Sequence, residues 1–205
     1  MVGERYQTAL NRDDISQWLV HFTKQGWSGS QLEPADVVLR RIINSRSVQA
    51  SKADAITRYH PSGAACFYDV PPQNWTELIQ TNPSGRQPYG IIVSKAAFWA
   101  RGGRPAIYTE NPLNPMWPQN ERFRLITTAL DQPNPIDWTH EREWRVPGDL
   151  PLDFQSLWWW PCVAQIRDAL LLFRDFSQGN VNAAVVINSI YVIELNRTIL
   201  RSELD

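Results

Sequence analysis

The chain has 205 residues and 43% of them are hydrophobic, which is enough to build one sizeable core. It carries 10 Trp, 7 Phe, 6 Tyr and 15 Pro. This composition argues against a disordered chain, a coiled coil or a simple helical bundle. The net charge of −1 does not point to a nucleic-acid partner for the chain as a whole. An irregular, loop-rich domain with aromatic stacking surfaces is expected.

The elements expected in chain order alternate without a regular pattern. Strands are predicted at residues 18–22, 64–70, 89–94, 105–109, 141–146, 154–160, 185–187 and 190–195. Helices are predicted at residues 75–80, 95–100, 122–130 and 166–176, after a first helix that Pro34 opens. Loops are predicted at residues 24–33, 82–88 and 132–138. This order predicts the α+β class in one domain spanning residues 1–205, with its core at about residues 16–200.

The ends and the cysteines indicate the compartment. The first residues are polar and charged, unlike a secretory signal, and the apolar stretches are too short to span a bilayer. Cys66 and Cys162 stand in no metal-binding spacing and are expected to be buried thiols. A cytoplasmic protein without a membrane partner is therefore expected, with no metal site.

Familiar catalytic motifs are missing. The sequence has no Gly-rich phosphate loop, no HExxH and no GxSxG. The densest polar cluster is the segment from Asp137 to Val146. If residues 141–146 form a strand, Glu141, Glu143 and Arg145 share one face, and Trp144 and Val146 face the core. That face is either an exposed set of cross-strand ion pairs or a carboxylate held by an arginine in a cleft.

Several segments together resemble a known group of proteins. They are HFT at residues 21–23, CFYDVP at 66–71, YGI at 89–91, GGRPAIY at 102–108 and EREWRV at 141–146. In this order they resemble a bacterial family that includes abortive-infection-type proteins. That family is in turn distantly similar to the DarT-like ADP-ribosyltransferases, which begin with a His-x-Thr strand and carry a catalytic glutamate in a late strand.

The resemblance implies a mixed or split β-sheet with flanking helices, of the ADP-ribosyltransferase type, and NAD as the substrate. It gives Glu143 the place of the catalytic glutamate, with Glu141 beside it. His21 and Thr23 take the first-strand position at the nicotinamide end of NAD. Two further NAD-binding roles are not assigned to single residues. The candidates for the aromatic that stacks on nicotinamide are Tyr68 and Tyr89, and those for the arginine that binds phosphate are Arg40, Arg41, Arg46 and Arg145.

The implied activity is that of a bacterial toxin or phage-defence effector that modifies a nucleic acid or a protein, with an antitoxin as a possible partner. Trp117 and residues 158–160 are candidate acceptor surfaces, or else packing residues. Two alternatives stay open. One is a non-catalytic binding or regulatory module in which Glu143 is structural. The other is a metal-dependent nuclease that uses Asp137, Glu141 and Glu143.

Overall fold

The computed structural model describes residues 16–28, 30–81, 85–153, 159–177 and 187–203. Its centre is an eight-stranded, mostly antiparallel sheet with the strand order β14-β13-β12-β6-β1-β5-β10-β7. The strands of this sheet are β1 (Trp18–Lys24), β5 (Ala64–Tyr68), β6 (Arg86–Ser94), β7 (Arg104–Pro105), β10 (Glu143–Pro147), β12 (Trp159–Val163), β13 (Ser189–Val192) and β14 (Arg197–Leu200). Neighbours β12 and β13 run parallel. The predicted α+β class is thereby confirmed.

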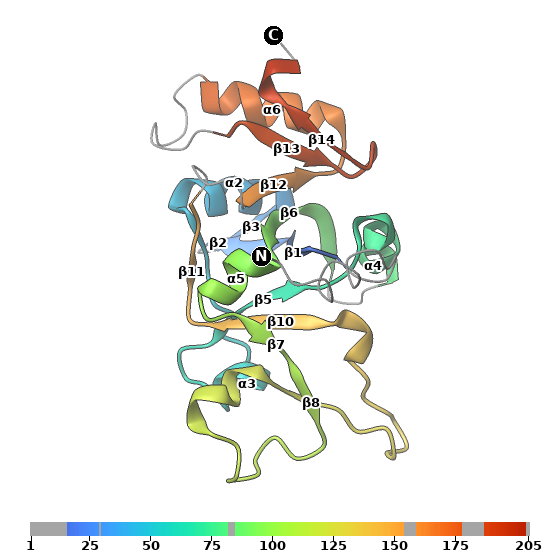
Figure 1. The fold of residues 1–205 in the computed structure, drawn as a ribbon. Helices are drawn as coiled ribbons and strands as arrows, with labels where there is room; N and C mark the ends of the chain where they lie inside the picture. Colours follow the sequence, from blue (N-terminus) through green and yellow to red (C-terminus); the bar gives the residue numbers. More distant parts are fainter. Residues whose placement is uncertain (1–15, 29, 82–84, 154–158, 178–186, 204–205) are drawn as a thin grey trace, which may run out of the picture.

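Helices flank the sheet and short strand pairs decorate it. The α-helices are α2 (Ala35–Ser45), α3 (Asp54–Thr57), α4 (Trp75–Thr81), α5 (Lys95–Ala100) and α6 (Ile166–Ser177). The short pairs are β2 (Gly26–Ser28) with β3 (Gln31–Glu33), β4 (Ser47–Val48) with β11 (Leu150–Pro151), and β8 (Ile107–Thr109) with β9 (Leu125–Thr127). In Figure 1, α6 lies with β13 and β14 at one end of the molecule, and α3 and β8 lie at the other.

Both faces of the central strands are buried. Leu19 packs in one core cluster with Phe67 and Ile91, whereas its neighbour Val20 packs with Tyr68 in a second cluster. Successive residues of a strand point to opposite faces, so an apolar run such as WLVHF suits a strand covered on both sides. The predicted first strand is confirmed and extends to Lys24.

The first helix follows its sequence pattern. Its buried side chains include Leu39, Ile42 and Ile43, whose spacing places them on one helical face. The helix ends where Arg46 adopts a left-handed conformation with φ of 52°, and the Arg46 N–H returns to the carbonyl of Ile43 at 3.2 Å. Helix α5 matches its predicted bounds, because the Ser94 side chain caps it by accepting from the N–H of Ala97.

Several local predictions differ from the structure. The strand expected at 105–109 is divided between β7, in the central sheet, and β8, which pairs with β9. Residues 122–130 were expected to be helical, but a 3-10 helix, η2 (Gln119–Arg124), is followed by β9, which pairs in parallel with β8. This pairing buries Leu125 and thus overrides the local propensity. The loop expected at 24–33 contains the β2–β3 hairpin. Strand β6 begins at Arg86, within the loop expected at 82–88.

The remaining expectations fall partly outside the described residues. Of the predicted strand at 154–160, only residues 159 and 160 lie in the described ranges, and they belong to β12. Of 185–187, only Ile187 is described, and it is buried. The last predicted strand, 190–195, is split: β13 ends at Val192 and a turn leads to β14. No helix of the described ranges has the length and apolar character needed to cross a bilayer.

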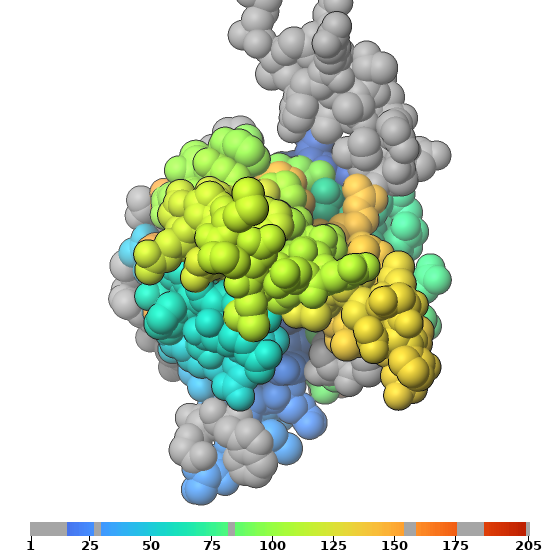
Figure 2. All heavy atoms as spheres, turned by 90° about the horizontal axis from the view of Figure 1, so that it is seen from below, coloured from blue at the N-terminus to red at the C-terminus, as the bar shows by residue number. Residues whose placement is uncertain are grey.

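The lower end of the molecule is built from segments distant in sequence. Figure 2 shows this face, with the cyan region that contains α3 beside the yellow-green region that contains β8 and η2. Arg145 ties this end to the sheet, because its Nη1 donates to the carbonyls of Phe123 and Leu125 at 3.3 and 3.0 Å. Strand β10 therefore connects the central sheet with the β8–β9 pair.

Candidate functional site

A cavity lies where strands β1 and β5 separate. In the described residues these strands pair at Val20 and Tyr68, while β1 continues along β6 as far as the Lys24–Arg86 pair. The space beside the separated strands is about 430 Å³ and is lined by residues of β1, β5, β6 and the start of β10. His21 and Glu143 both line it. Because Glu143 pairs with Tyr68, the backbones of β10 and β1 lie two strand spacings apart here, about 10 Å.

His21 is held in one tautomer at the point of separation. Its Nδ1 lies 2.8 Å from the carbonyl oxygen of Cys66, which only accepts, so Nδ1 carries the proton. This side-chain contact takes the place of the backbone hydrogen bonds that would continue the β1–β5 pairing beyond Val20 and Tyr68. Burial lowers the pKa of His21, which favours the neutral ring. Nε2 is then an acceptor, and the ring of Phe67, with its centroid 5.4 Å away, packs beside the imidazole.

Gly90 permits the close approach of β6 to His21. A Cβ atom at this position would lie 2.3 Å from the carbonyl oxygen of His21, which is far inside van der Waals contact. Gly90 pairs with Phe22 in the β1–β6 ladder. The YGI segment therefore contributes to the site through its glycine. Because Gly90 has no side chain, β6 can pack closely against the backbone of β1 at His21.

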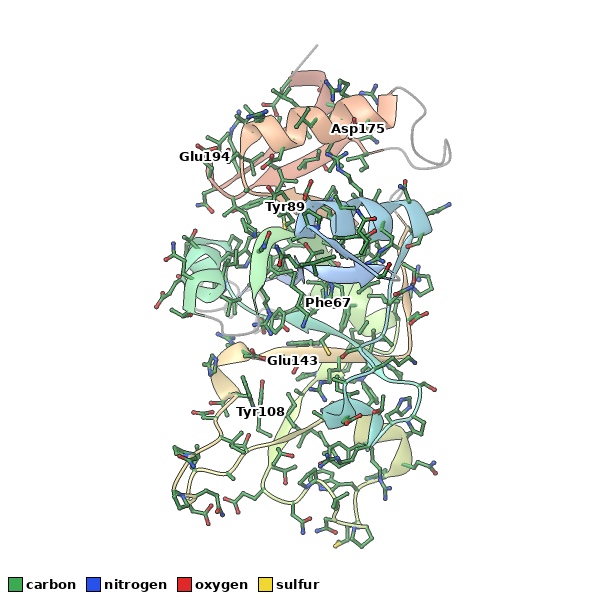
Figure 3. The ribbon with its side chains drawn as sticks, turned by 180° about the vertical axis from the view of Figure 1, so that it is seen from behind. Phe67, Tyr89, Tyr108, Glu143, Asp175 and Glu194 are labelled. Atoms are coloured by element: carbon green, nitrogen blue, oxygen red, sulfur yellow. The ribbon has the colours of Figure 1, made fainter. Side chains whose placement is uncertain are left out.

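Glu143 begins strand β10 and is 6% exposed. Its Oε2 accepts from Arg145 Nη2 at 3.1 Å, in a pair whose two side chains are each 7% exposed. Its backbone N–H donates to the hydroxyl of Tyr108 at 2.9 Å. Burial raises the pKa of that tyrosine to about 12, so the hydroxyl stays protonated. Figure 3 shows Tyr108 beside Glu143 on the side away from Phe67.

Glu141 reaches the same cavity by a different route from the one expected. The strand begins at Glu143, and Glu141 ends a 3-10 helix, η3 (Thr139–Glu141). Between them Arg142 has φ of 46°, a left-handed conformation that is uncommon outside glycine. The prediction that residues 141–146 form one strand was therefore wrong at its start. Both glutamates nevertheless line the cavity, and both are buried, so the exposed ion-pair interpretation is also wrong.

Arg86 is a site residue that the sequence interpretation missed. Its guanidinium lies 3.9 Å from the centroid of the Tyr68 ring, and Nη2 donates to the Tyr68 hydroxyl and, at 3.0 Å, to Glu141 Oε1. The Arg86 and Glu141 side chains are 9% and 8% exposed. Arg86 was overlooked because residues 82–88 were assigned to a loop, and extending the strand alternation backwards from Gly90 was the signal that could have found it.

Tyr68 lines the cavity and Thr23 supports it. Burial, then the nearby Glu143 carboxylate, raises the pKa of Tyr68 well above its ordinary value. The Thr23 hydroxyl lies 2.9 Å from the carbonyl of Ala35 and 3.0 Å from that of Tyr89. Its single proton is thus shared with the backbone, so Thr23 fixes α2 and β6 against β1. Thr23 also lines the cavity, as the sequence predicted for the first-strand position.

Tyr89 and Arg40 lie elsewhere. The Tyr89 hydroxyl donates to Asp168 at 3.2 Å, and Arg40 pairs with Asp175, so both residues join the centre of the molecule to α6. They line a separate space of about 40 Å³. Figure 3 shows Tyr89 on the α6 side of Phe67, away from Glu143. Their predicted contact with NAD is not supported, because side chains at 89 and 40 face helix α6.

Arg41 borders a second cavity next to the first. This cavity of about 190 Å³ shares His21, Val38 and Gln49 with the larger one, so the two adjoin. Arg41 pairs with Glu33 at 3.3 Å and its side chain is 45% exposed. Arg145, another predicted NAD-binding residue, is committed to Glu143 and to two backbone carbonyls, and it is absent from the cavity lining.

The residues of the nuclease and stacking hypotheses are dispersed. Asp137 is exposed, and hydrogen bonds from Thr139 lower its pKa. It does not line the cavity with the two glutamates. In the ranges that the structure describes, no three His, Cys, Asp or Glu residues are grouped as metal ligands would be. Trp159 is buried, Trp117 donates to the Asn111 carbonyl at 3.2 Å, and Trp158 lies outside the described residues.

Comparisons with protein-family models, curated proteins and solved structures found no match for this chain. The site is therefore interpreted from its own geometry. It combines a neutral histidine acceptor, two buried carboxylates that each pair with an arginine, and a tyrosine beneath a guanidinium, all around one cavity.

Proposed function

We propose that the chain is an NAD-dependent ADP-ribosyltransferase with Glu143 as its catalytic carboxylate. The observation that carries the proposal is that His21 and Glu143, from strands far apart in sequence, line one cavity at the place where the sheet separates. The resemblance of HFT and EREWRV to this class assigns both residues to one active site. The split in the sheet is consistent with the fold that the same resemblance implies.

The chemistry requires an anion beside the ribose. Breaking the bond between C1′ of the ribose and the nicotinamide nitrogen leaves positive charge on the sugar, and nicotinamide departs with the bonding electrons. A carboxylate fixed nearby stabilises that charge without having to reorganise. The nucleophile of the acceptor then bonds to C1′ and gives up its proton, which Glu143 can take. The pair with Arg145 and the contact with Tyr108 orient the glutamate for this role.

Histidine and tyrosine have distinct roles in the proposal. The unprotonated Nε2 of His21 is suited to accept a hydrogen bond from a ribose hydroxyl. Of the two tyrosines considered for stacking on nicotinamide, only Tyr68 lines the cavity, so the proposal assigns the stacking position to Tyr68. Glu141 lies beside Glu143 and is the second carboxylate available to the acceptor.

The acceptor and the biological role follow from the resemblance alone. A toxin or phage-defence effector of this class modifies a nucleic acid or a protein, and a cognate antitoxin restrains it.

A nicotinamide-release assay tests the proposal. The wild-type chain is incubated with NAD labelled in the nicotinamide, in the presence of bacterial nucleic acid or lysate protein, and free nicotinamide is measured. Glu143→Gln should lower the rate about a hundredfold or more, because the charge is lost while the shape is kept. Glu121→Gln, a change to a partly exposed glutamate paired with Arg124, is the matched control and should leave the rate unchanged.

One observation favours a second candidate, a non-catalytic binding module. Glu143 is already neutralised by a buried arginine, as structural glutamates often are. The release assay, run beside a calorimetric measurement of NAD binding by the wild type, separates the two candidates. NAD binding without release would indicate the binding module, whereas absence of both binding and release would overturn the proposed function. An unchanged rate in Glu143→Gln would remove this residue from its catalytic role.

A further inference from the structure

One charged group in the cavity is incompletely paired. The Nη1 atom of Arg86 is buried and has no hydrogen-bond partner among the described residues, although Nη2 is bound by Tyr68 and Glu141. The Arg86 side chain is 9% exposed and lines the cavity. A buried charged donor without a partner is unfavourable, so a ligand oxygen that accepts from the Arg86 guanidinium would satisfy it.

A second cation lies next to Arg86. Lys24 is its register partner across the β1–β6 ladder, also lines the cavity, and is exposed. Directly paired strand residues have neighbouring side chains on one face of a sheet. The end of the cavity at β1 and β6 therefore presents two positive charges, of which Glu141 balances one.

The charge of the cavity favours an anionic ligand. Its charged lining residues are Lys24, Arg86, Glu141 and Glu143. Arg145, which does not line the cavity, balances the charge of Glu143 through their ion pair. With both carboxylates paired to arginines, Lys24 leaves an excess of positive charge at this end. Arginine is suited to phosphate oxygens because its donors are arranged in a planar fork.

We propose that Arg86 and Lys24 form a subsite for a diphosphate group, and that Glu141 is the internal anion with which that group competes for Arg86. The subsite rests on the proposed function for its most natural ligand, the diphosphate of NAD. It places that group at the end of β1 and the beginning of β6. Arg40, Arg41 and Arg46, which were considered from the sequence, have no part in it.

If the ligand and Glu141 compete for Arg86, removing the charge of Arg86 and removing the charge of Glu141 have opposite effects on ligand affinity. Removing the positive charge of Arg86 removes attraction for the ligand. Removing the negative charge of Glu141 leaves Arg86 fully available and takes away a repulsion. A purely structural Arg86–Glu141 pair does not predict opposite signs, because loss of either partner would then disturb the site in the same direction.

Calorimetry with inorganic pyrophosphate and, separately, with ADP-ribose tests the subsite. Arg86→Gln should weaken pyrophosphate binding about tenfold or more, the value of one charge-assisted hydrogen bond. Lys24→Gln should weaken it severalfold, and Glu141→Gln should tighten it. Arg174→Gln, a change to a 60% exposed arginine on α6, is the control and should have no effect. Thermal melts establish that each variant is folded.

The outcomes distinguish the subsite from the proposed function. Equal affinity in wild type and Lys24→Gln, or weaker binding in Glu141→Gln, would overturn the subsite even if Arg86→Gln failed to fold. No binding of either probe to the wild type would overturn it as well. Pyrophosphate binding with the expected signs but no release of nicotinamide would leave the subsite standing and reject the transferase. Binding of ADP-ribose but not of pyrophosphate would locate recognition in the nucleoside parts and also reject the subsite.

Discussion

The Nδ1 of His21 donates to the Cys66 carbonyl across the separated strands β1 and β5, at 2.8 Å. This bond fixes both the position of the imidazole and the nitrogen that carries its proton. The histidine is thus committed to the neutral form by its surroundings, because burial opposes the charged ring.

Acid should destabilise the protein through His21. Its pKa is lowered in the folded chain, so the unfolded chain binds more protons once the pH falls below about 6.5, and stability decreases on further acidification toward the folded pKa. His21→Gln removes this titration. In urea unfolding at pH 7 and at pH 5.5, the wild type should lose more stability than the variant. Equal losses would show that His21 does not titrate differently on folding.

Arg145 should be a major contributor to stability. Arg145→Met leaves Glu143 buried without its partner and removes the donor from two carbonyls, with an expected loss of about 3–5 kcal/mol. Arg124→Met, which breaks a more exposed pair with Glu121 and a bond to a carbonyl, should cost clearly less. Urea denaturation measures both. A smaller loss at 145 than at 124 would contradict the role given to the buried pair.

Gly90 should not accept a side chain. Gly90→Ala places a methyl group 2.3 Å from the His21 carbonyl oxygen, so β1 and β6 must move apart, at a cost of roughly 1–3 kcal/mol. Gly26→Ala is the control, because its nearest contact would be an ordinary van der Waals contact of 3.4 Å, to the side chain of Val38. Thermal denaturation should rank these variants, with Gly90→Ala the less stable. A tolerated Gly90→Ala would show that the close approach is not required.

Tyr89 should be dispensable for ligand binding. Tyr89→Phe removes the hydroxyl that donates to Asp168 near α6, and should lower stability by about 0.5–1.5 kcal/mol with unchanged affinity for NAD. Tyr68→Phe removes the acceptor for Arg86 inside the cavity and should change that affinity. Calorimetry with NAD compares the two variants. An effect of Tyr89→Phe larger than that of Tyr68→Phe would reverse the assignment made from the structure.

The sequence predicted the strands and helices whose patterns are local. The apolar run from Trp18 to Phe22, the helix after Pro34 and the helix at residues 95–100 all have periodicity or capping residues of their own. The structure of residues 122–130 is not determined by a local pattern of this kind. Their apolar side chains suited a helix, but β9 forms because β8, some eighteen residues earlier, offers a strand to pair with.

The candidate site was predictable in its strands and not in its charges. His21 and Glu143 belong to segments with a recognisable order, and they line one cavity. Arg86 lies at a strand end that resembled a loop, and its partner Glu141 depends on the left-handed turn at Arg142. Such a turn at a non-glycine residue is set by tertiary contacts, so strand alternation alone could not anticipate that both glutamates face inward.

Strand β5 has a further consequence for the ligand. Its Cys66 carbonyl holds His21, and its Tyr68 is the register partner of Glu143. The positions of His21 and Glu143, on two sides of the cavity, are therefore both set by this one five-residue strand. Its Phe67 is fully buried against Phe98, with ring centroids 4.9 Å apart. The packing of the core beneath β5 therefore sets the width of the cavity. A change of volume at Phe67 would alter which ligands fit, although Phe67 itself does not line the cavity, because the residue packs beside the His21 ring.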